Sequence, residues 1–267
     1  MINFKNLFCV AAIAVTFASC QKDEALLAEQ DETISASVVA QIKALGFGTQ
    51  DIQKIDEGYL VEGDIVLTHN DLNTKADQKL LNVANFEQYR TNNLVSGLPR
   101  VIKIGVDSKL GSKYVTCAQA MISRYNAENL QITMQYVTSG ANITFVAAPR
   151  SAQYLASAGF PTNGNPYGTV KVNAYYLDRN GWDNNSIISI MAHEAGHCIG
   201  FRHTDYMDRS YSCGGGYANE GASTVGAVHI PNTPTTADAG SWMLACIGKN
   251  VNRPFNNNDK TALNYLY

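Results

Sequence analysis

Two histidines four residues apart in the stretch MAHEAGHCIGFRH are the side chains best placed to do chemistry. On a helix, His193 and His197 would project from one face, with Cβ atoms roughly 5–6 Å apart. Imidazoles at that separation can share one Zn²⁺ at about 2.0–2.1 Å from each nitrogen. Glu194 follows the first histidine and can act on a water at the ion without binding the ion itself. This spacing predicts a zinc site in which Glu194 serves as the general base.

The residues after the second histidine extend the motif. Gly200 can leave the helix through a left-handed turn that most residues with a Cβ avoid. Such a turn would bring His203 back toward the helix as a third ligand. Three protein ligands leave one position for water, which is typical of a catalytic zinc, whereas a structural zinc is closed by a fourth side chain. The pattern therefore favours catalysis.

The histidines must be held by a helix, which we predict over residues 184–199. Apolar residues recur in it at helical spacing, Asn184 or Asn185 can cap its start, and Gly200 ends it. Upstream, the patterns predict a strand over 101–106, an amphipathic helix over 114–127, two β runs on either side of Ser139-Gly140, and a strand region over 167–177. An irregular, glycine-rich half follows the histidine motif. This order predicts an α+β domain.

The first 19 residues have the organisation of a signal peptide. A lysine precedes an apolar run from Leu7 to Phe17, and small residues then lead to Cys20. The run is too short to cross a bilayer but matches a signal-peptide core, and the alternative is a buried first helix. The letters ASC at its end resemble the bacterial lipobox, in which the cysteine is lipidated. We therefore expect Cys20 to anchor the protein in the bacterial cell envelope, as an outer-membrane lipoprotein that can be surface-exposed; the alternative is secretion.

Residues 20–98 have the character of a pro-segment or linker before a catalytic domain over 99–267. A helical pattern over 34–47 precedes a run of β-formers, which the letters EGD at 62–64 break as a hairpin or bulge. No further cysteine follows Cys20 in this segment, and no cluster of catalytic residue types occurs in it. A latency device that uses a cysteine is therefore excluded.

Four cysteines follow this segment, and in an oxidising compartment they allow three pairings. We favour a bond between Cys213 and Cys246, because it would clamp the irregular half near the histidine motif. Cys117 and Cys198 would then tie the two long helices together. The alternative for Cys198 is a small buried thiol.

The charge of the chain bears on its partners. The formal net charge is −3 and charged residues make up 16% of the sequence, so no basic stripe is available for a phosphate backbone. We expect no nucleic-acid partner.

The stretch HEAGHCIGFRH resembles the zinc motif of the metzincin peptidases, which a methionine-containing turn follows. GSWMLAC places Met243 for that turn. The likeness extends to the bacterial dual-action HEIGH metallopeptidases through YLVEGDIVLT, RVIKIGVD, HTDY, SCGGG, EGASTVGAVHIPNTP, SWMLACIG and TALNYLY, although Ala195 stands where the family name has isoleucine. It implies a metzincin-like catalytic domain: a twisted mixed sheet, two long helices that include the active-site helix, and an irregular C-terminal half with the Met-turn.

The same resemblance implies a metalloendopeptidase that holds one Zn²⁺ by His193, His197 and His203 and acts on a protein or peptide. Met243 would form an apolar floor beneath the imidazoles. Substrate in metzincins lies extended along an edge strand, which would here be Gly168–Asn173, through strand addition.

Two residues just past the third ligand, Asp205 and Tyr206, are expected to orient His203 or the loop beneath it. A plain surface turn is the alternative. Ala245 occupies the place where some metzincins carry a tyrosine that assists the oxyanion, so the metal would carry most of that charge unless Tyr206 or another group reaches in.

The stretch Val61-Glu62-Gly63-Asp64 resembles the F-x-G-D sequence of astacin-type zymogens, with valine for phenylalanine. In those zymogens the aspartate occupies the open zinc position. The resemblance implies that Asp64 keeps the enzyme latent, and the alternative is an ordinary turn aspartate.

Two other functions stay open. One is a lipid-anchored envelope module for binding or adhesion, with a structural zinc and no hydrolytic activity. The other is an amidase that acts on cell-wall peptides by the same chemistry. Glu194 favours hydrolysis over the first, because a non-catalytic site needs no carboxylate beside its metal. Calcium binding is open as well.

Overall fold

The computed structural model describes residues 34–73, 88–221, 226–234 and 237–267. By its contacts the chain divides into Met1–Thr33 and Ile34–Tyr267, and every described residue belongs to the second unit. The predicted signal peptide and Cys20 lie outside the described residues. Within the described ranges, no helix combines the length and the apolar character that a membrane crossing requires.

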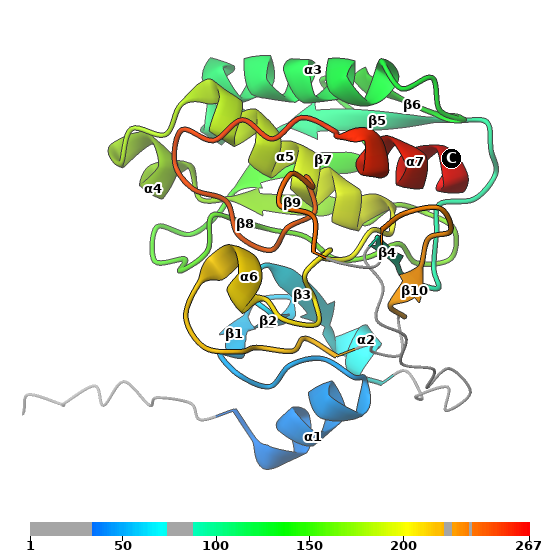
Figure 1. Ribbon diagram of the computed structural model, residues 1–267. Helices are drawn as coiled ribbons and strands as arrows, with labels where there is room; N and C mark the ends of the chain where they lie inside the picture. The colour runs from blue at the N-terminus through cyan, green and yellow to red at the C-terminus, as the bar shows by residue number, and fades with distance from the viewer. Residues whose placement is uncertain (1–33, 74–87, 222–225, 235–236) are drawn as a thin grey trace, which may run out of the picture. The chain divides into compact units, whose positions relative to one another are not determined.

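The N-terminal part of the described chain is a short helix followed by an antiparallel sheet. It contains α1 (Ala36–Ala44), β1 (Gln53–Ile55), β2 (Gly58–Val61), β3 (Ile65–Thr68) and α2 (His69–Leu72), with strand order β1-β2-β3 (Figure 1). Glu62 and Gly63 connect β2 to β3 with φ angles of 57° and 95°, a left-handed conformation that glycine adopts without steric cost. The predicted hairpin at 62–64 is confirmed.

A five-stranded sheet forms the centre of the remaining chain. Its strands are β5 (Arg100–Val106), β6 (Ile132–Tyr136), β7 (Ile143–Ala147), β8 (Ala156–Ser157) and β9 (Thr169–Val172), in the order β6-β5-β7-β9-β8. The two predicted β runs, β6 and β7, do not pair with each other, because β5 lies between them and is parallel to both. β9 is parallel to β7, and β8 is antiparallel to β9.

Two long helices, α3 (Ser112–Asn126) and α5 (Asn184–Ile199), pack against each other and share one hydrophobic core with the sheet. The buried face of α3 consists of Tyr114, Cys117, Ala118, Met121, Ile122 and Tyr125. The Tyr125 hydroxyl donates a 2.7 Å hydrogen bond to the Ala192 carbonyl and so joins the two helices. The α+β architecture is confirmed, and both helices lie within two residues of their predicted bounds.

The chain after α5 has little regular structure. Its elements are α6 (Ser210–Cys213), β10 (Val228–His229) and α7 (Asn257–Leu266). β10 pairs with β4 (Tyr89–Arg90), which precedes the large sheet in the chain. Two short helices before α5, η2 (Ser108–Leu110) and α4 (Ala174–Arg179), complete the described elements. A disulfide joins Cys213 to Cys246 across a sequence separation of 33, as predicted. The irregular half is therefore held by a covalent link beside the histidine motif.

The second predicted disulfide is wrong. Cys117 and Cys198 are both free and buried. The sulfur of Cys117 lies 4.0 Å from the carbonyl oxygen of Asn184, at the start of α5, whereas Cys198 lies near the end of that helix. About 14 helical residues correspond to roughly 21 Å, which is far more than the Cα separation of about 4.4–6.8 Å that a disulfide allows.

Two smaller expectations are also corrected. Asp183 caps α5, in place of the predicted Asn184 or Asn185, through its side chain and the Ser186 N–H. In the predicted strand region 167–177, only Thr169–Val172 is extended, because the Asn173 side chain caps α4 instead.

The expected substrate strand lies inside the sheet. β9 pairs on both sides, with β7 and with β8, so it has no open edge for strand addition. The edge is β8, and the residue after it, Ala158, is already paired with the hairpin segment: Val66 N–H donates to the Ala158 carbonyl at 2.8 Å, and Ala158 N–H donates to the Asp64 carbonyl at 3.0 Å.

Candidate metal centre

Helix α5 carries the histidine pair on a face that is buried in the protein. His193, Glu194 and His197 are 7%, 2% and 0% exposed. The helix ends at Gly200, whose φ of 111° lies in the left-handed region. A Cβ added there would lie 2.7 Å from the Leu94 side chain, so both conformation and space require glycine. The predicted role of Gly200 in turning the chain agrees with this geometry.

The turn brings His203 beside the other two histidines. Ring centroids are 4.6 Å apart for His193 and His197, 5.2 Å for His193 and His203, and 4.8 Å for His197 and His203. One ligand atom from each of these residues and one from Asp64 all lie within 4.8 Å of one another. The structure therefore gathers the three predicted ligands, and the carboxylate predicted for latency, around one point.

Each imidazole is oriented by a hydrogen bond at Nδ1. His193 Nδ1 lies 2.9 Å from the Trp242 carbonyl, and His197 Nδ1 lies 2.8 Å from the Phe201 carbonyl. A carbonyl only accepts, so Nδ1 is the donor in both rings, and the neutral form of such a ring has its lone pair at Nε2. His203 Nδ1 lies 2.9 Å from each Glu220 carboxylate oxygen. In metal sites, a hydrogen-bond partner at the ring nitrogen that does not bind the metal fixes the tautomer and the orientation of the imidazole.

The donor set fits a zinc-type ion. Among the described residues, His193 Nε2 and Glu194 Oε2 are buried atoms without a hydrogen-bond partner. Two further Nε2 atoms, of His197 and His203, face each other at 3.2 Å. A buried polar atom without a partner is costly, and an ion among the three Nε2 atoms would satisfy these nitrogens. Three imidazoles with a carboxylate in reach are ligands that Zn²⁺ accepts.

Asp64 reaches this point from the turn between β2 and β3. Its Oδ2 lies 3.1 Å from His203 Nε2 and 3.4 Å from His193 Nε2. Burial opposes ionisation of this carboxyl, but the neighbouring imidazoles of His203 and His193 hold its pKa well below the usual range. Asp64 therefore sits as an anion at the position where the three histidines converge.

Burial also tunes the groups of the helix. It raises the pKa of Glu194, and the neighbouring Asp64 charge raises it further. A carboxylate with a raised pKa is a stronger base. Burial lowers the pKa of His197, and the neighbouring His193 and His203 act in the same direction, so His197 is neutral and able to bind a metal.

Met243 packs directly against helix α5, which carries His193 and His197. A Cβ added to Gly196 would lie 2.5 Å from the Met243 sulfur and 3.1 Å from the Trp242 indole nitrogen. Gly196 therefore allows this close approach, a requirement that the sequence did not reveal. The Trp242 carbonyl orients His193, so the turn at 241–243 contributes both apolar packing and one hydrogen bond.

Of the two residues expected to support His203, Asp205 supports its loop and Tyr206 packs nearby. Asp205 accepts hydrogen bonds from Ala245 N–H at 2.9 Å and from the Ser212 hydroxyl at 2.5 Å. The ring of Tyr206 packs edge to face against the ring of Tyr89, with ring centroids 4.4 Å apart. The residue that contacts His203 Nδ1 is Glu220. Glu220 begins the stretch EGASTVGAVHIPNTP, which the family resemblance singled out, but no spacing in the sequence indicated that it would contact His203.

A buried ion pair links the hairpin to the same region. Arg202 Nη2 lies 3.3 Å from Glu62 Oε2, and both side chains are almost fully buried. Burial raises the pKa of Glu62, and Glu220 raises it further, whereas Arg202 opposes the shift. Removal of either partner would leave a buried charge, which is strongly destabilising.

Helix α7 anchors the turn that orients His193. Asp259 accepts hydrogen bonds from the Ser241 hydroxyl at 2.8 Å, Trp242 N–H at 3.2 Å and the Gln88 amide at 2.8 Å. Burial of its carboxyl nevertheless raises its pKa from 3.8 to about 6, since desolvation outweighs these hydrogen bonds.

This pKa shift predicts a pH dependence of stability. Between pH about 4 and about 6 the folded state binds more protons at Asp259 than the unfolded state, so this group's contribution to stability falls as pH rises. We expect the difference in free energy of unfolding between Asp259→Asn and wild type to shift by about 2–4 kcal/mol in favour of the variant when the pH rises from 4 to 7. Urea unfolding of both metal-free proteins at the two pH values measures this; a constant difference would contradict it.

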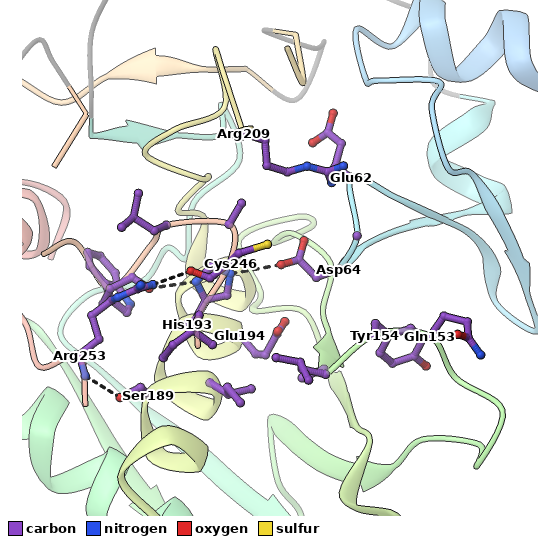
Figure 2. Close-up of a pocket in the computed structure, with 18 residues that line it drawn as sticks. Glu62, Asp64, Gln153, Tyr154, Ser189, His193, Glu194, Arg209, Cys246 and Arg253 are labelled. Carbon is purple, nitrogen blue, oxygen red and sulfur yellow. Dashed lines mark hydrogen bonds and ion pairs between the residues drawn. The ribbon is translucent and has the colours of Figure 1, made fainter. Parts of the chain in front are cut away.

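A cavity of about 240 Å³ opens beside His193 and Glu194 (Figure 2). Its walls are Glu62, Gly63 and Asp64 of the hairpin, Gln153–Ala156 before and in β8, Ser189 and Ile190 of α5, Arg209, Trp242, 244–247 and Arg253. The space therefore lies between α5, the sheet edge at β8 and the segment after Met243, and the hairpin forms one of its walls. Such a cavity beside a buried carboxylate and a histidine cluster is typical of metal-dependent hydrolases.

Comparison with known proteins agrees with this class. The Dual-action HEIGH metallo-peptidase family matches residues 59–267, and the chain therefore belongs to that family of metallopeptidases. The match begins in β2 and so includes the hairpin as well as the histidine motif. No curated protein matches the chain.

Solved structures share a limited likeness with the chain. Myroilysin has 17% sequence identity and a TM-score of 0.39, over 62% of this chain and 79% of its own. High choriolytic enzyme 1, a hatching enzyme zinc-protease from the medaka fish Oryzias latipes, has 16% identity and a TM-score of 0.36, over 68% and 93%. The ECX AB5 holotoxin in its GM1-bound form has 15% identity and a TM-score of 0.33, over 46% of this chain and 64% of its own, which is less than two thirds.

Proposed function

We propose that this metallopeptidase is a zinc-dependent endopeptidase, exported to the cell envelope and made as a latent precursor. The observation that carries the proposal is the convergence of three histidine ligand atoms and the Asp64 carboxylate within 4.8 Å of one another, beside Glu194. His193, His197 and His203 would hold the ion through Nε2. Asp64 would occupy the position that water needs.

The catalytic step follows from the side chains of the helix. When bound, zinc lowers the pKa of water and polarises the substrate carbonyl. Glu194 would accept the proton of the attacking water and pass it to the leaving amine, because its Oε2 has no other partner among the described residues. Glu220, Trp242 and Phe201 would keep the imidazoles oriented through their Nδ1 atoms.

Latency would have two parts. The Asp64 carboxylate would compete with water for the ion, and the main chain of Asp64–Val66 pairs with Ala158 at the sheet edge. Strand addition at that edge is a usual mode of peptide recognition. The hairpin therefore stands where an extended substrate would bind, and the precursor would become active when it leaves.

Metal removal tests the proposed function. The hairpin formed by β2 and β3 (58–68) is first removed by limited proteolysis. We then expect a chelator to abolish casein hydrolysis and one equivalent of Zn²⁺ to restore it. The reason is that His193, His197 and His203 belong to the only possible metal-binding cluster among the described residues. Metal content and fluorescent casein release are the measurements. Full activity in the chelated protein would refute a metal-dependent mechanism.

Export and the lipid anchor at Cys20 complete the proposal, and palmitate labelling of expressing cells tests the anchor. The alternative, an anchored binding module with a structural zinc, predicts a metal-loaded protein that hydrolyses no peptide.

A further inference from the structure

The cavity beside Glu194 contains two arginines with different surroundings. The Arg209 side chain already faces a carboxylate, since its Nε lies 3.9 Å from Glu220 Oε1. No carboxylate of the described residues lies within ion-pair distance of the Arg253 guanidinium, whose hydrogen-bond acceptor is the Cys246 carbonyl at 3.0 Å from Nη1. Arg253 is therefore a cation without a direct counter-ion among the residues that the structure describes.

The position of Arg253 is held by the protein around it. Its backbone N–H donates to the Ser189 hydroxyl of α5 at 2.9 Å, and Cys246, which accepts from its side chain, is fixed by the disulfide to Cys213. Figure 2 shows these two hydrogen bonds as dashed lines from Arg253 to Ser189 and to Cys246. The guanidinium is thus placed in advance, at little further entropic cost to binding.

The side chains around Arg253 are largely apolar, so a guanidinium charge without a counter-ion is energetically costly at this position. Ile190, Trp242, Leu244 and Ile247 line the same cavity. Burial lowers the pKa of Arg253, and Asp205 and Asp259 oppose this only from a distance. An arginine has five N–H donors in a fork that matches a carboxylate, and one of them is used by Cys246.

We propose that Arg253 binds a carboxylate of the substrate beside the scissile bond, so that the enzyme prefers acidic peptides. This inference rests on the proposed peptidase function. The carboxylate can belong to an aspartate or glutamate side chain or to the end of a peptide chain. Arg253 would be the residue that determines specificity, while Glu194 and the histidines perform the reaction.

The test compares matched peptides that differ in one carboxylate. Full-length protein with the Asp64→Ala substitution is loaded with Zn²⁺ and given C-terminally amidated peptides with glutamate or glutamine at one position, and a glutamine peptide with a free C-terminus. We expect the preferred carboxylate peptide to exceed its neutral partner on the order of 10- to 100-fold in kcat/KM, as for a desolvated charge-assisted hydrogen bond. Mass spectrometry of the products locates the carboxylate relative to the cleaved bond. The amidated and free peptides tell a side chain from a chain end.

Variants assign the preference to one residue. Arg253→Gln should abolish the discrimination and Arg253→Lys should keep part of it, because the charge remains without the fork. Arg179 is an exposed arginine on α4 beside Tyr175. Arg179→Gln is therefore the matched control and should leave the discrimination between the peptides unchanged. Equal cleavage of all peptides would overturn the inference and leave the peptidase function standing. Loss of the preference in Arg209→Gln but not in Arg253→Gln would also overturn it.

A binding measurement separates this inference from the proposed function. In the Asp64→Ala/Glu194→Gln protein, fluorescence anisotropy should show the same preference for the carboxylate peptide, and Arg253→Gln should remove it. If no peptide is hydrolysed by any form but the binding preference is present, the assignment of a carboxylate-binding role to Arg253 holds and the peptidase proposal fails.

Discussion

Glu194→Gln is expected to reduce peptide hydrolysis by about 10³-fold or more while the protein keeps its metal and its fold. General acid–base catalysis of this kind contributes about 10²–10⁴-fold, and glutamine cannot accept the proton of the attacking water. The amide is nearly the same size as the buried carboxylate that it replaces, which is 2% exposed. The histidines and their Nδ1 partners are untouched, so metal affinity should not fall.

The measurements are kcat/KM on a fluorogenic peptide, metal content and thermal unfolding, all on protein from which the hairpin has been removed. Glu128→Gln is a suitable control, because this carboxylate pairs with Lys260 at 3.3 Å and does not line the cavity. A Glu194→Gln protein with near wild-type turnover would remove Glu194 from the mechanism. Loss of metal in that variant would instead mean that Glu194 holds the ion.

Asp64→Ala is expected to make the full-length precursor at least about tenfold more active than wild type. The substitution removes the carboxylate that lies 3.1 Å from His203 Nε2 and 3.4 Å from His193 Nε2, so the position is released to water. A factor of ten corresponds to about 1.4 kcal/mol of competition. Activation should be partial, because the main-chain hydrogen bonds between 64–66 and Ala158 do not depend on that side chain.

The control for this variant lies in the same segment. Asp56 is exposed in the turn between β1 and β2, and Asp56→Ala should leave the precursor latent. Casein hydrolysis by intact precursors is the measurement, with gel electrophoresis to exclude processing during the assay. An Asp64→Ala precursor that is no more active than wild type would end the latency proposal.

The two long helices, the main strands and the grouping of the three histidines could largely be predicted from the sequence, for a local reason. The spacing of His193 and His197 needs only helical geometry, and Gly200 needs only a left-handed turn, so both follow from residues close in the chain. The clamp between Cys213 and Cys246 was predicted because both cysteines flank the irregular half near the histidine motif. The pairing of Cys117 with Cys198 failed because sequence does not reveal which ends of two packed helices meet.

The partners of these residues depended on contacts between distant parts of the chain. Glu220 on His203, Asp259 beneath the Met243 turn and Ala158 beside Asp64 join segments far apart in sequence, and no local pattern predicts such pairs. The order of the strands in the sheet could not be predicted either. The alternation of apolar and polar residues in β9 is the same whether the strand lies at an edge or inside the sheet.

The sequence by itself determined the donor types, their spacing on one helix and the turn that returns a third histidine, since these follow from local backbone geometry. Only the tertiary structure decided that Asp64 meets those histidines and that Gly196 admits Met243 beneath them. It also decided that Arg253 lines the adjoining cavity with no carboxylate of the described residues as its counter-ion. Those features arise from packing among chain segments that are remote in sequence, where long-range burial outweighs local preference.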